Sequence, residues 1–302
     1  MPTSAEPDPG VDESRVALVL DWFAASARDL PWRRRDCSAW GVLVSEVMLQ
    51  QTPVARVLPV WAEWMERWPT PARLADDTQA DAVRAWGTLG YPRRAKRLWE
   101  CARAVVERHG GRVPSDAEAL LALPGVGDYT ASAVRAFAFG ERAVVLDTNV
   151  RRVLARVWDG NPLPATSVRA VERALAERVA PVDPTTAATW AAASMELGAL
   201  VCTARAPRCQ ECPVAASCAW FAAGRVGLEE ARRRTQAWHG TDRQVRGRIL
   251  ALLREAEAPV VIEGRTSLAD VEPAQVGRCL ESLLADGLLA LKDADRGLYQ
   301  LA

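Results

Sequence analysis

Hydrophobic residues recur at intervals of three and four from residue 13 to about residue 220, the spacing that places them on one face of an α-helix. Short breaks containing proline and glycine separate the periodic stretches and mark helix ends. We find neither the alternation typical of strands nor a repeat of fixed period. The pattern therefore predicts an all-α core, with helices over 13–28, 39–50, 54–67, 94–109, 117–123, 129–139, 150–158, 167–179 and 184–200.

The pattern changes after Thr241. Residues 243–255 and 272–286 each form an amphipathic stretch, and residues 288–301 have the pattern of a short hairpin with its turn near Gly297. Two helices followed by a β-ribbon predict a small C-terminal winged-helix-like α/β module over 241–302. This module holds eight basic and ten acidic residues, a formal charge of −2, which argues against a main role for it in binding a polyanion such as nucleic acid.

The two remaining stretches are polar. Residues 1–12 are expected to be a disordered tail, and residues 223–240 a linker between the helical core of residues 13–222 and the C-terminal module. The linker contains Arg232, Arg233 and Arg234 in a row, which suit either a solvated connection or contact with a DNA backbone.

Composition narrows the possible chemistry. No apolar run reaches the roughly 18 residues of a membrane-spanning helix, and the polar, acidic N-terminus is not that of a signal peptide, so we expect a cytoplasmic protein without membrane contact. The 38 basic and 38 acidic residues cancel, so any DNA-binding face must be local. The chain has only two lysines, Lys96 and Lys292, and two histidines, which leaves few candidates for a Schiff base or a histidine base.

The run Leu-Pro-Gly-Val-Gly-Asp-Tyr-Thr over 123–130 joins two predicted helices. Two glycines one residue apart permit a tight turn and a close approach of the backbone. The following helix begins with free N–H groups and the positive end of its dipole, which suit a phosphate oxygen. The run predicts either a DNA-backbone contact that ignores base sequence or a plain helix–helix connection.

Four of the seven cysteines fall within seventeen residues, with the spacing C-x6-C-x2-C-x5-C. Four thiolates this close suit a 4Fe–4S cluster or a zinc ion, and the single C-x2-C pair favours the cluster because zinc sites more often use two. The first loop carries Arg205 and Arg208, which a rigid cluster would present to phosphate. The expected ligands are Cys202, Cys209, Cys212 and Cys218.

Two carboxylates are candidates for catalysis. Glu46 lies in an apolar helix, where a carboxyl group either pairs with an arginine or keeps its proton and acts as a general acid. Gln50 and Gln51 follow one turn later and could read the edge of a base. Asp147 precedes a helix, which suits an N-cap or an ionised carboxylate beside developing positive charge.

In combination these motifs resemble the helix–hairpin–helix superfamily of base-excision glycosylases, and within it the MutY-type adenine DNA glycosylases. The matching residues cover 29–218, and the run SEVMLQQT is specific to that branch. The resemblance implies a six-helix barrel over about 33–146, a second subdomain of 13–32 plus 147–222 with the cluster loop 202–218, and a 4Fe–4S cluster. It also implies excision of adenine opposite 8-oxoguanine or guanine in double-stranded DNA, by a protein expected to be monomeric.

The resemblance also implies roles for single residues. Glu46 would protonate adenine N7 and Asp147 would stabilise the sugar cation, with Tyr129 and Asn149 as active-site neighbours. A target base must be flipped out of the duplex, at a cost of roughly a few kcal/mol. The residues expected at DNA are Arg33, Gln50, Gln51, Tyr91, which would wedge into the duplex, Leu123, Gly125, Val126, Gly127, Arg205 and Arg208.

Three features of the chain change what the resemblance implies, and two of them are departures from the usual pattern of the family. The strand-cutting branch has a lysine where this chain has Tyr129, so little or no strand nicking is expected. Thr148 replaces the usual glycine between the Asp and the Asn, and the residues after Gly240 are too few and too helical for the Nudix-like domain that recognises 8-oxoguanine. Two alternatives are a thymine or uracil mismatch glycosylase on the same scaffold and a non-enzymatic iron–sulfur DNA-binding regulator.

Overall fold

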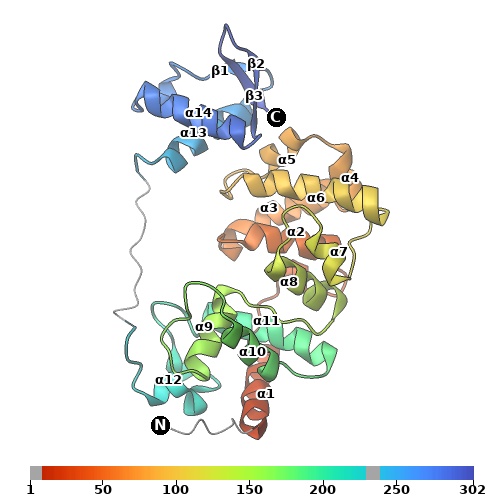
Figure 1. Ribbon diagram of the computed structural model, residues 1–302, viewed down its shortest axis with the longest axis vertical. Helices are drawn as coiled ribbons and strands as arrows, with labels where there is room; N and C mark the ends of the chain where they lie inside the picture. Colours follow the sequence, from red (N-terminus) through yellow and green to blue (C-terminus); the bar gives the residue numbers. More distant parts are fainter. Residues whose placement is uncertain (1–8, 229–238) are drawn as a thin grey trace. The chain divides into compact units, whose positions relative to one another are not determined.

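The computed structural model describes residues 9–228 and 239–302, and the predicted all-α core with a small C-terminal α/β module is confirmed (Figure 1). The chain divides into two compact units. Of the described residues, the first unit contains 9–42, 115–117 and 127–228, and the second contains 43–114, 118–126 and 239–302.

The first unit is a group of helices (Figure 1), and it contains a large apolar core and a smaller apolar cluster. Helix α11 packs along α9 and also against α1, and Val19, Val153 and Leu197 are fully buried in this core. Gly198 allows the close approach, because a Cβ there would lie 2.7 Å from the Cβ of Asn149. The elements are α1 (Pro9–Ser26), η1 (Pro31–Arg33), α8 (Asp128–Phe139), α9 (Thr148–Val157), α10 (Ala170–Val179), α11 (Pro184–Leu200), η2 (Cys209–Glu211), η3 (Ala215–Ser217) and α12 (Ala219–Ala222).

The helical part of the second unit packs around tryptophans. The ring of Trp64 meets those of Trp68 and Trp86 edge to face, with centroids 4.8 Å and 5.6 Å apart, and all three side chains are buried. Such pairs add about 0.5–1.5 kcal/mol each beyond their burial. The helices are α2 (Ala39–Leu49), α3 (Val54–Arg67), α4 (Pro71–Asp76), α5 (Gln79–Ala85), α6 (Arg93–His109) and α7 (Ala117–Leu121), of which α2 and α7 begin in the first unit.

The C-terminal module consists of two packed helices and a three-stranded antiparallel sheet in the order β1-β3-β2. The predicted hairpin is present, with Leu289 opposite Leu301, and β1 adds a third strand that the sequence did not reveal. Within the second unit, Gln79 Nε2 donates to the carbonyl of Gly287 at 2.6 Å and Lys96 Nζ to that of Asp286 at 3.2 Å. The elements are α13 (Asp242–Glu255), β1 (Val260–Val261), η4 (Thr266–Leu268), α14 (Pro273–Ala285), β2 (Leu289–Asp293) and β3 (Leu298–Leu301).

Some boundaries differ from the sequence prediction. The expected disordered tail is wrong for residues 9–12, which begin α1, and residues 1–8 lie outside the described residues. Helices α4 and α5 were not predicted, because six or seven residues are too few to show a period. Helix α8 belongs to the first unit, although the predicted barrel included it. The three consecutive arginines of the linker also lie outside the described residues.

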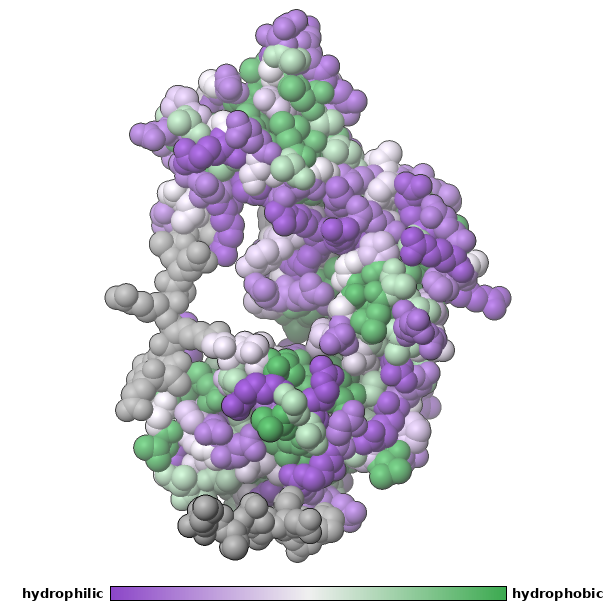
Figure 2. All heavy atoms as spheres, viewed as in Figure 1, coloured by the Kyte–Doolittle hydropathy of each residue, from purple (hydrophilic) through white to green (hydrophobic). Residues whose placement is uncertain are grey.

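Hydrophobic and hydrophilic residues alternate in small patches over the visible surface, and no single apolar face dominates this view (Figure 2). The most exposed large hydrophobic side chains are those of Val182, Val226 and Val171. Among the helices of residues 9–228 and 239–302, none combines the length and the apolar character that crossing a bilayer requires.

Candidate functional site

Glu46 lies in the most buried helix of the second unit. Every residue from 40 to 48 on α2 is buried, and Glu46 itself is 4% exposed. The run is apolar almost throughout, so the helix has no solvent face between these residues. The burial that the sequence predicted for this carboxyl group is present, and its role as a proton donor stays a prediction.

Asp147 is the N-cap of α9 in the first unit. Its Oδ1 accepts hydrogen bonds from the backbone N–H groups of Asn149 at 2.9 Å and Val150 at 2.7 Å, and its Oδ2 accepts one from the Asn149 side chain at 2.7 Å. Burial raises the pKa of this carboxyl above its ordinary value, whereas these donors and the guanidinium of Arg152 act in the opposite direction. The carboxylate is therefore held in one orientation by three donors.

Two buried arginines, which sequence reasoning missed, extend this network along α9. Arg152 donates to Asn149 Oδ1 at 2.8 Å and to the carbonyl of Cys202 at 2.7 Å. Arg156, fully buried, donates to the carbonyl of Thr203 at 2.7 Å and to Cys202 Sγ at 3.4 Å. A continuous chain of hydrogen bonds thus runs from Asp147 to the first cysteine of the cluster motif.

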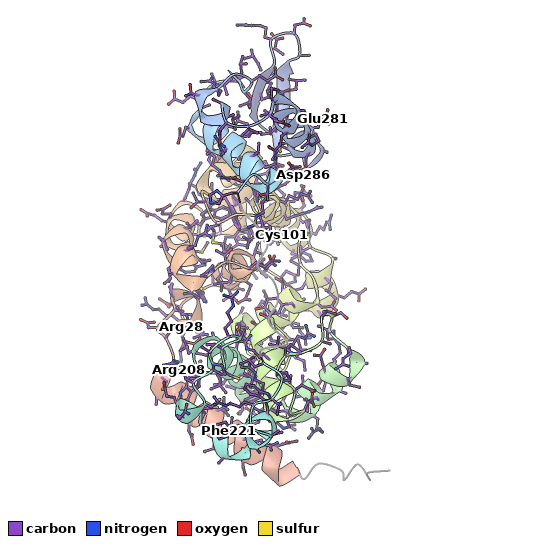
Figure 3. All side chains as sticks on the ribbon, turned by 90° about the vertical axis from the view of Figure 1, so that its left-hand side faces the viewer. Arg28, Cys101, Arg208, Phe221, Glu281 and Asp286 are labelled. Atoms are coloured by element: carbon purple, nitrogen blue, oxygen red, sulfur yellow. The ribbon has the colours of Figure 1, made fainter. Side chains whose placement is uncertain are left out.

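The loop of residues 203–208 follows that cysteine. Arg205 and Arg208 are both exposed on it. Arg208, labelled in Figure 3, donates to the carbonyl of Leu200 at 2.6 Å and pairs with Glu211 at 2.8 Å, so part of its hydrogen-bonding capacity is already used. The predicted phosphate contacts of these two arginines stay predictions.

The hairpin between α7 and α8 has buried anchors and exposed glycines. Leu123 and Val126 are buried, whereas Gly125 and Gly127 are exposed. Gly125 has a φ of +80°, and a Cβ there would lie 2.8 Å from the Cβ of Arg97. This position therefore demands glycine on two grounds. Gly127 precedes α8, so its neighbourhood offers the free N–H groups of a helix start.

Tyr129 lies in the first turn of α8 and is half-buried. It packs against a small apolar cluster made by Ala133, Ala136, Val145 and Ala191. Tyr129, Asp147 and Asn149 all belong to the first unit, whereas Glu46 belongs to the second.

Three residues that are expected to contact DNA come after helices of the second unit. Gln51 and Tyr91 are exposed, and both have left-handed backbones, with φ of +56° and +49°. Gln50 is half-buried and lines a cavity of about 150 Å³ together with Arg94, Cys101 and Gly125. Cys101 lies on α6 (Figure 3).

Arg33 has a structural partner in the first unit. Its guanidinium pairs with Glu196 at 2.9 Å, and Arg28 pairs with the same carboxylate at 2.7 Å. These two arginines outweigh the effect of burial and lower the pKa of Glu196 to about 2. Arg33 therefore forms an ion pair within the protein, and its expected contact with DNA stays a prediction.

Comparison with known proteins places these features in a family. Residues 44–181 match the profile of the HhH-GPD superfamily base excision DNA repair proteins, and residues 202–218 match the iron–sulfur binding domain of endonuclease III. The adenine DNA glycosylase of Mycobacterium tuberculosis is 50% identical over 287 residues, which cover 94% of this chain and 93% of that protein. This chain belongs to the adenine DNA glycosylase family.

The chain is also similar to two other kinds of DNA repair enzyme. A thymine-DNA glycosylase of Aeropyrum pernix is 34% identical over 219 residues, 71% of this chain and 97% of that protein. Endonuclease III in a non-covalent complex with DNA shares 20% identity and the fold, with a TM-score of 0.62 over 74% of this chain and all of that one. The match to the mycobacterial glycosylase extends into the C-terminal module, so that adenine DNA glycosylase shares much of this module with the chain.

The iron–sulfur cofactor predicted from the cysteine spacing is confirmed by the domain match. The four cysteines line one small cavity with Arg156 and Trp220. Within the described part of the chain, no three Cys, His, Asp or Glu side chains converge on a single ion. A 4Fe–4S cluster needs no such convergence, because each cysteine binds a different iron. Burial raises the pKa of the Cys212 thiol to about 12, and the positive charge of a bound metal centre would favour its thiolate form.

Proposed function

We propose that this adenine DNA glycosylase excises adenine paired with 8-oxoguanine or with guanine in double-stranded DNA, by hydrolysis of the N-glycosidic bond. The observation that carries the proposal is the 50% identity to an adenine DNA glycosylase over 94% of the chain, against 34% to a thymine-DNA glycosylase. We further propose that the enzyme acts as a monomer at the chromosome.

Glu46 is the proposed general acid. Adenine is a poor leaving anion, so a proton on N7 must accompany its departure, and a carboxyl group shielded from water is suited to supply it. Asp147 is the proposed stabiliser of the oxocarbenium ion, because its carboxylate is held in one orientation by three donors. Asn149 provides two of those donors and therefore positions Asp147, and we assign Tyr129 to the same site as a neighbour of the flipped base.

The positions of the two lysines agree with an enzyme that releases the base and does not cut the strand. Strand cleavage through a Schiff base needs a lysine at the reacting sugar, and position 129 holds a tyrosine. Lys96 donates to the carbonyl of Asp286, and Lys292 lies on β2 of the C-terminal module. We therefore expect base release without strand nicking.

We assign the cluster to Cys202, Cys209, Cys212 and Cys218. When bound, it holds the chain of residues 202–218 in one conformation, and the protein contributes the buried cation of Arg156 beside Cys202. The DNA face is assigned to the hairpin glycines with Leu123 and Val126, to Gln50, Gln51 and Tyr91, and to Arg33, Arg205 and Arg208. Purified enzyme should be brown and contain about four irons per chain; one zinc and no iron contradicts this assignment.

A substrate panel tests the function. Duplexes with A opposite 8-oxoguanine, A opposite G, T opposite G and A opposite T are incubated with wild-type enzyme, Glu46→Gln and a control, Glu63→Gln, which changes an exposed glutamate on α3. We expect adenine release from the first two duplexes, a loss of at least about a hundredfold in Glu46→Gln with DNA binding retained, and no change in the control. Release of thymine alone, or full activity of Glu46→Gln, contradicts the proposal.

A further inference from the structure

The side chain of Arg94 caps the helix that carries Glu46. Arg94 lies in the first turn of α6, and its Nη1 reaches three carbonyl oxygens at the C-terminal end of α2 and just beyond it. Carbonyls at a helix end lack intrahelical donors, and a cation there also complements the helix dipole. The accepting carbonyls belong to Val47 at 2.9 Å, Met48 at 3.0 Å and Gln50 at 2.6 Å.

The other terminal nitrogen of Arg94 holds a second segment. Its Nη2 donates to the carbonyl of Gly90 at 3.0 Å and to Thr52 Oγ1 at 3.0 Å. Thr52 Oγ1 in turn donates to the carbonyl of Leu89 at 3.3 Å. One guanidinium therefore connects the turn after α2 with the loop that leads into α6.

Each of these two segments contains a residue with an unfavourable backbone conformation. Besides Arg225, only Gln51 and Tyr91 are non-glycine residues with positive φ in the described ranges. Each of them directly follows a residue whose carbonyl accepts from Arg94, namely Gln50 and Gly90. Left-handed conformations of such residues persist only where their surroundings hold them.

The contacts of Arg94 need both its charge and its shape. Its guanidinium carbon lies 5.1 Å from the ring centroid of Trp86 and 5.4 Å from that of Tyr91. Burial lowers its pKa to about 10, so it stays charged at neutral pH. A lysine keeps the charge but cannot donate in two directions from a planar group while stacking on rings.

We propose that Arg94 is a positioning residue that fixes Gln51 and Tyr91 in one relative arrangement for their contact with the duplex. This inference rests on the proposed function, because it takes both residues to face DNA during base flipping. Arg94 itself need not touch DNA, because both of its terminal nitrogens donate hydrogen bonds inside the protein. Because the same guanidinium caps α2, the arrangement also fixes the end of the helix that bears Glu46.

The first test uses hydrogen exchange of the full-length enzyme without DNA. Arg94→Met keeps the length of the side chain and removes the charge, Arg94→Lys keeps the charge, and Arg97→Met is the control, one turn later on α6, exposed and paired with Glu100. In Arg94→Met we expect amides of 50–52 and 87–91 to exchange at least about tenfold faster, with a smaller effect in Arg94→Lys and none in the control. Faster exchange in only one of the two segments, or in neither, overturns the proposal.

The second test uses the reaction. In single-turnover release of adenine, Arg94→Met should be slower by about ten- to a hundredfold, whereas the Kd for an uncleavable duplex and the iron content change little. If Arg94 acts through Tyr91, then adding Arg94→Met to Tyr91→Ala should slow release less than about threefold further. Multiplicative effects of the two changes contradict the coupling. If wild-type enzyme releases no adenine, the proposed function fails, and the exchange experiment still decides the role of Arg94.

Discussion

Replacing Arg156 by methionine should destabilise the first unit strongly. Arg156 is fully buried, and its guanidinium lies over the ring of Trp220, with 4.5 Å from the guanidinium carbon to the ring centroid. Methionine keeps most of the apolar volume, so the change removes the hydrogen bonds with little loss of packing.

The size of this destabilisation follows from the acceptors that lose their donor in Arg156→Met. Arg156 donates to the carbonyls of Thr203 at 2.7 Å, Pro162 at 2.8 Å and Ala204 at 3.2 Å. A buried acceptor left without a donor costs about 1–3 kcal/mol, and water can reach some of this loop, so we expect a total of about 3–5 kcal/mol. At roughly 2–4 °C per kcal/mol for a unit of this size, Tm should fall by about 10 °C.

The assay is thermal unfolding of the iron-loaded enzyme followed by circular dichroism, with iron measured on the same samples. Arg173→Met is the matched control, because this arginine on α10 is half-exposed and lies 3.6 Å from its partner Asp128. An exposed ion pair contributes at most about 1 kcal/mol, so the control should unfold close to the wild type. An Arg156→Met enzyme that unfolds within about 2 °C of the wild type refutes the reasoning.

Three further changes test the site. Asn149→Ala removes the one side-chain donor to Asp147, whose pKa is already raised by burial, and leaves the backbone donors in place. A further rise of this pKa should move the acidic limb of the rate profile to higher pH, because base release needs the ionised carboxylate and falls as pH drops through its pKa. Gly125 has a φ of +80° and no room for a Cβ, so Gly125→Ala should weaken DNA binding about tenfold. At Gly127 nothing lies within 4 Å of an added Cβ, so Gly127→Ala should bind DNA at least several-fold more tightly than Gly125→Ala. Equal affinities of the two variants contradict the explanation. Gly198→Ala should lower both Tm and the rate of base release by displacing α9, and unchanged values of both exclude this close contact.

Arg33 has a partner that the sequence did not indicate. Its place in the run Leu-Pro-Trp-Arg suggested a contact with DNA, and the structure shows a buried carboxylate, Glu196, that binds both Arg33 and Arg28. Glu196 lies 163 residues further along the chain than Arg33, in a helix of ordinary composition. A pairing over such a separation leaves no local signal.

Local patterns determined the fold, the hairpin, the cofactor and the chemistry proposed for this chain. Glycine spacing, cysteine spacing and an apolar helix with one glutamate are each complete within about twenty residues, so their physical meaning can be derived from the sequence. The tertiary structure alone decided which arginines matter. Arg94, Arg152 and Arg156 lie in helices whose patterns favour solvent exposure of charge, and each of them donates to at least one carbonyl that is 44 to 50 residues away. A buried guanidinium is stable only where folding brings such acceptors around it, and no local sequence pattern predicts that geometry.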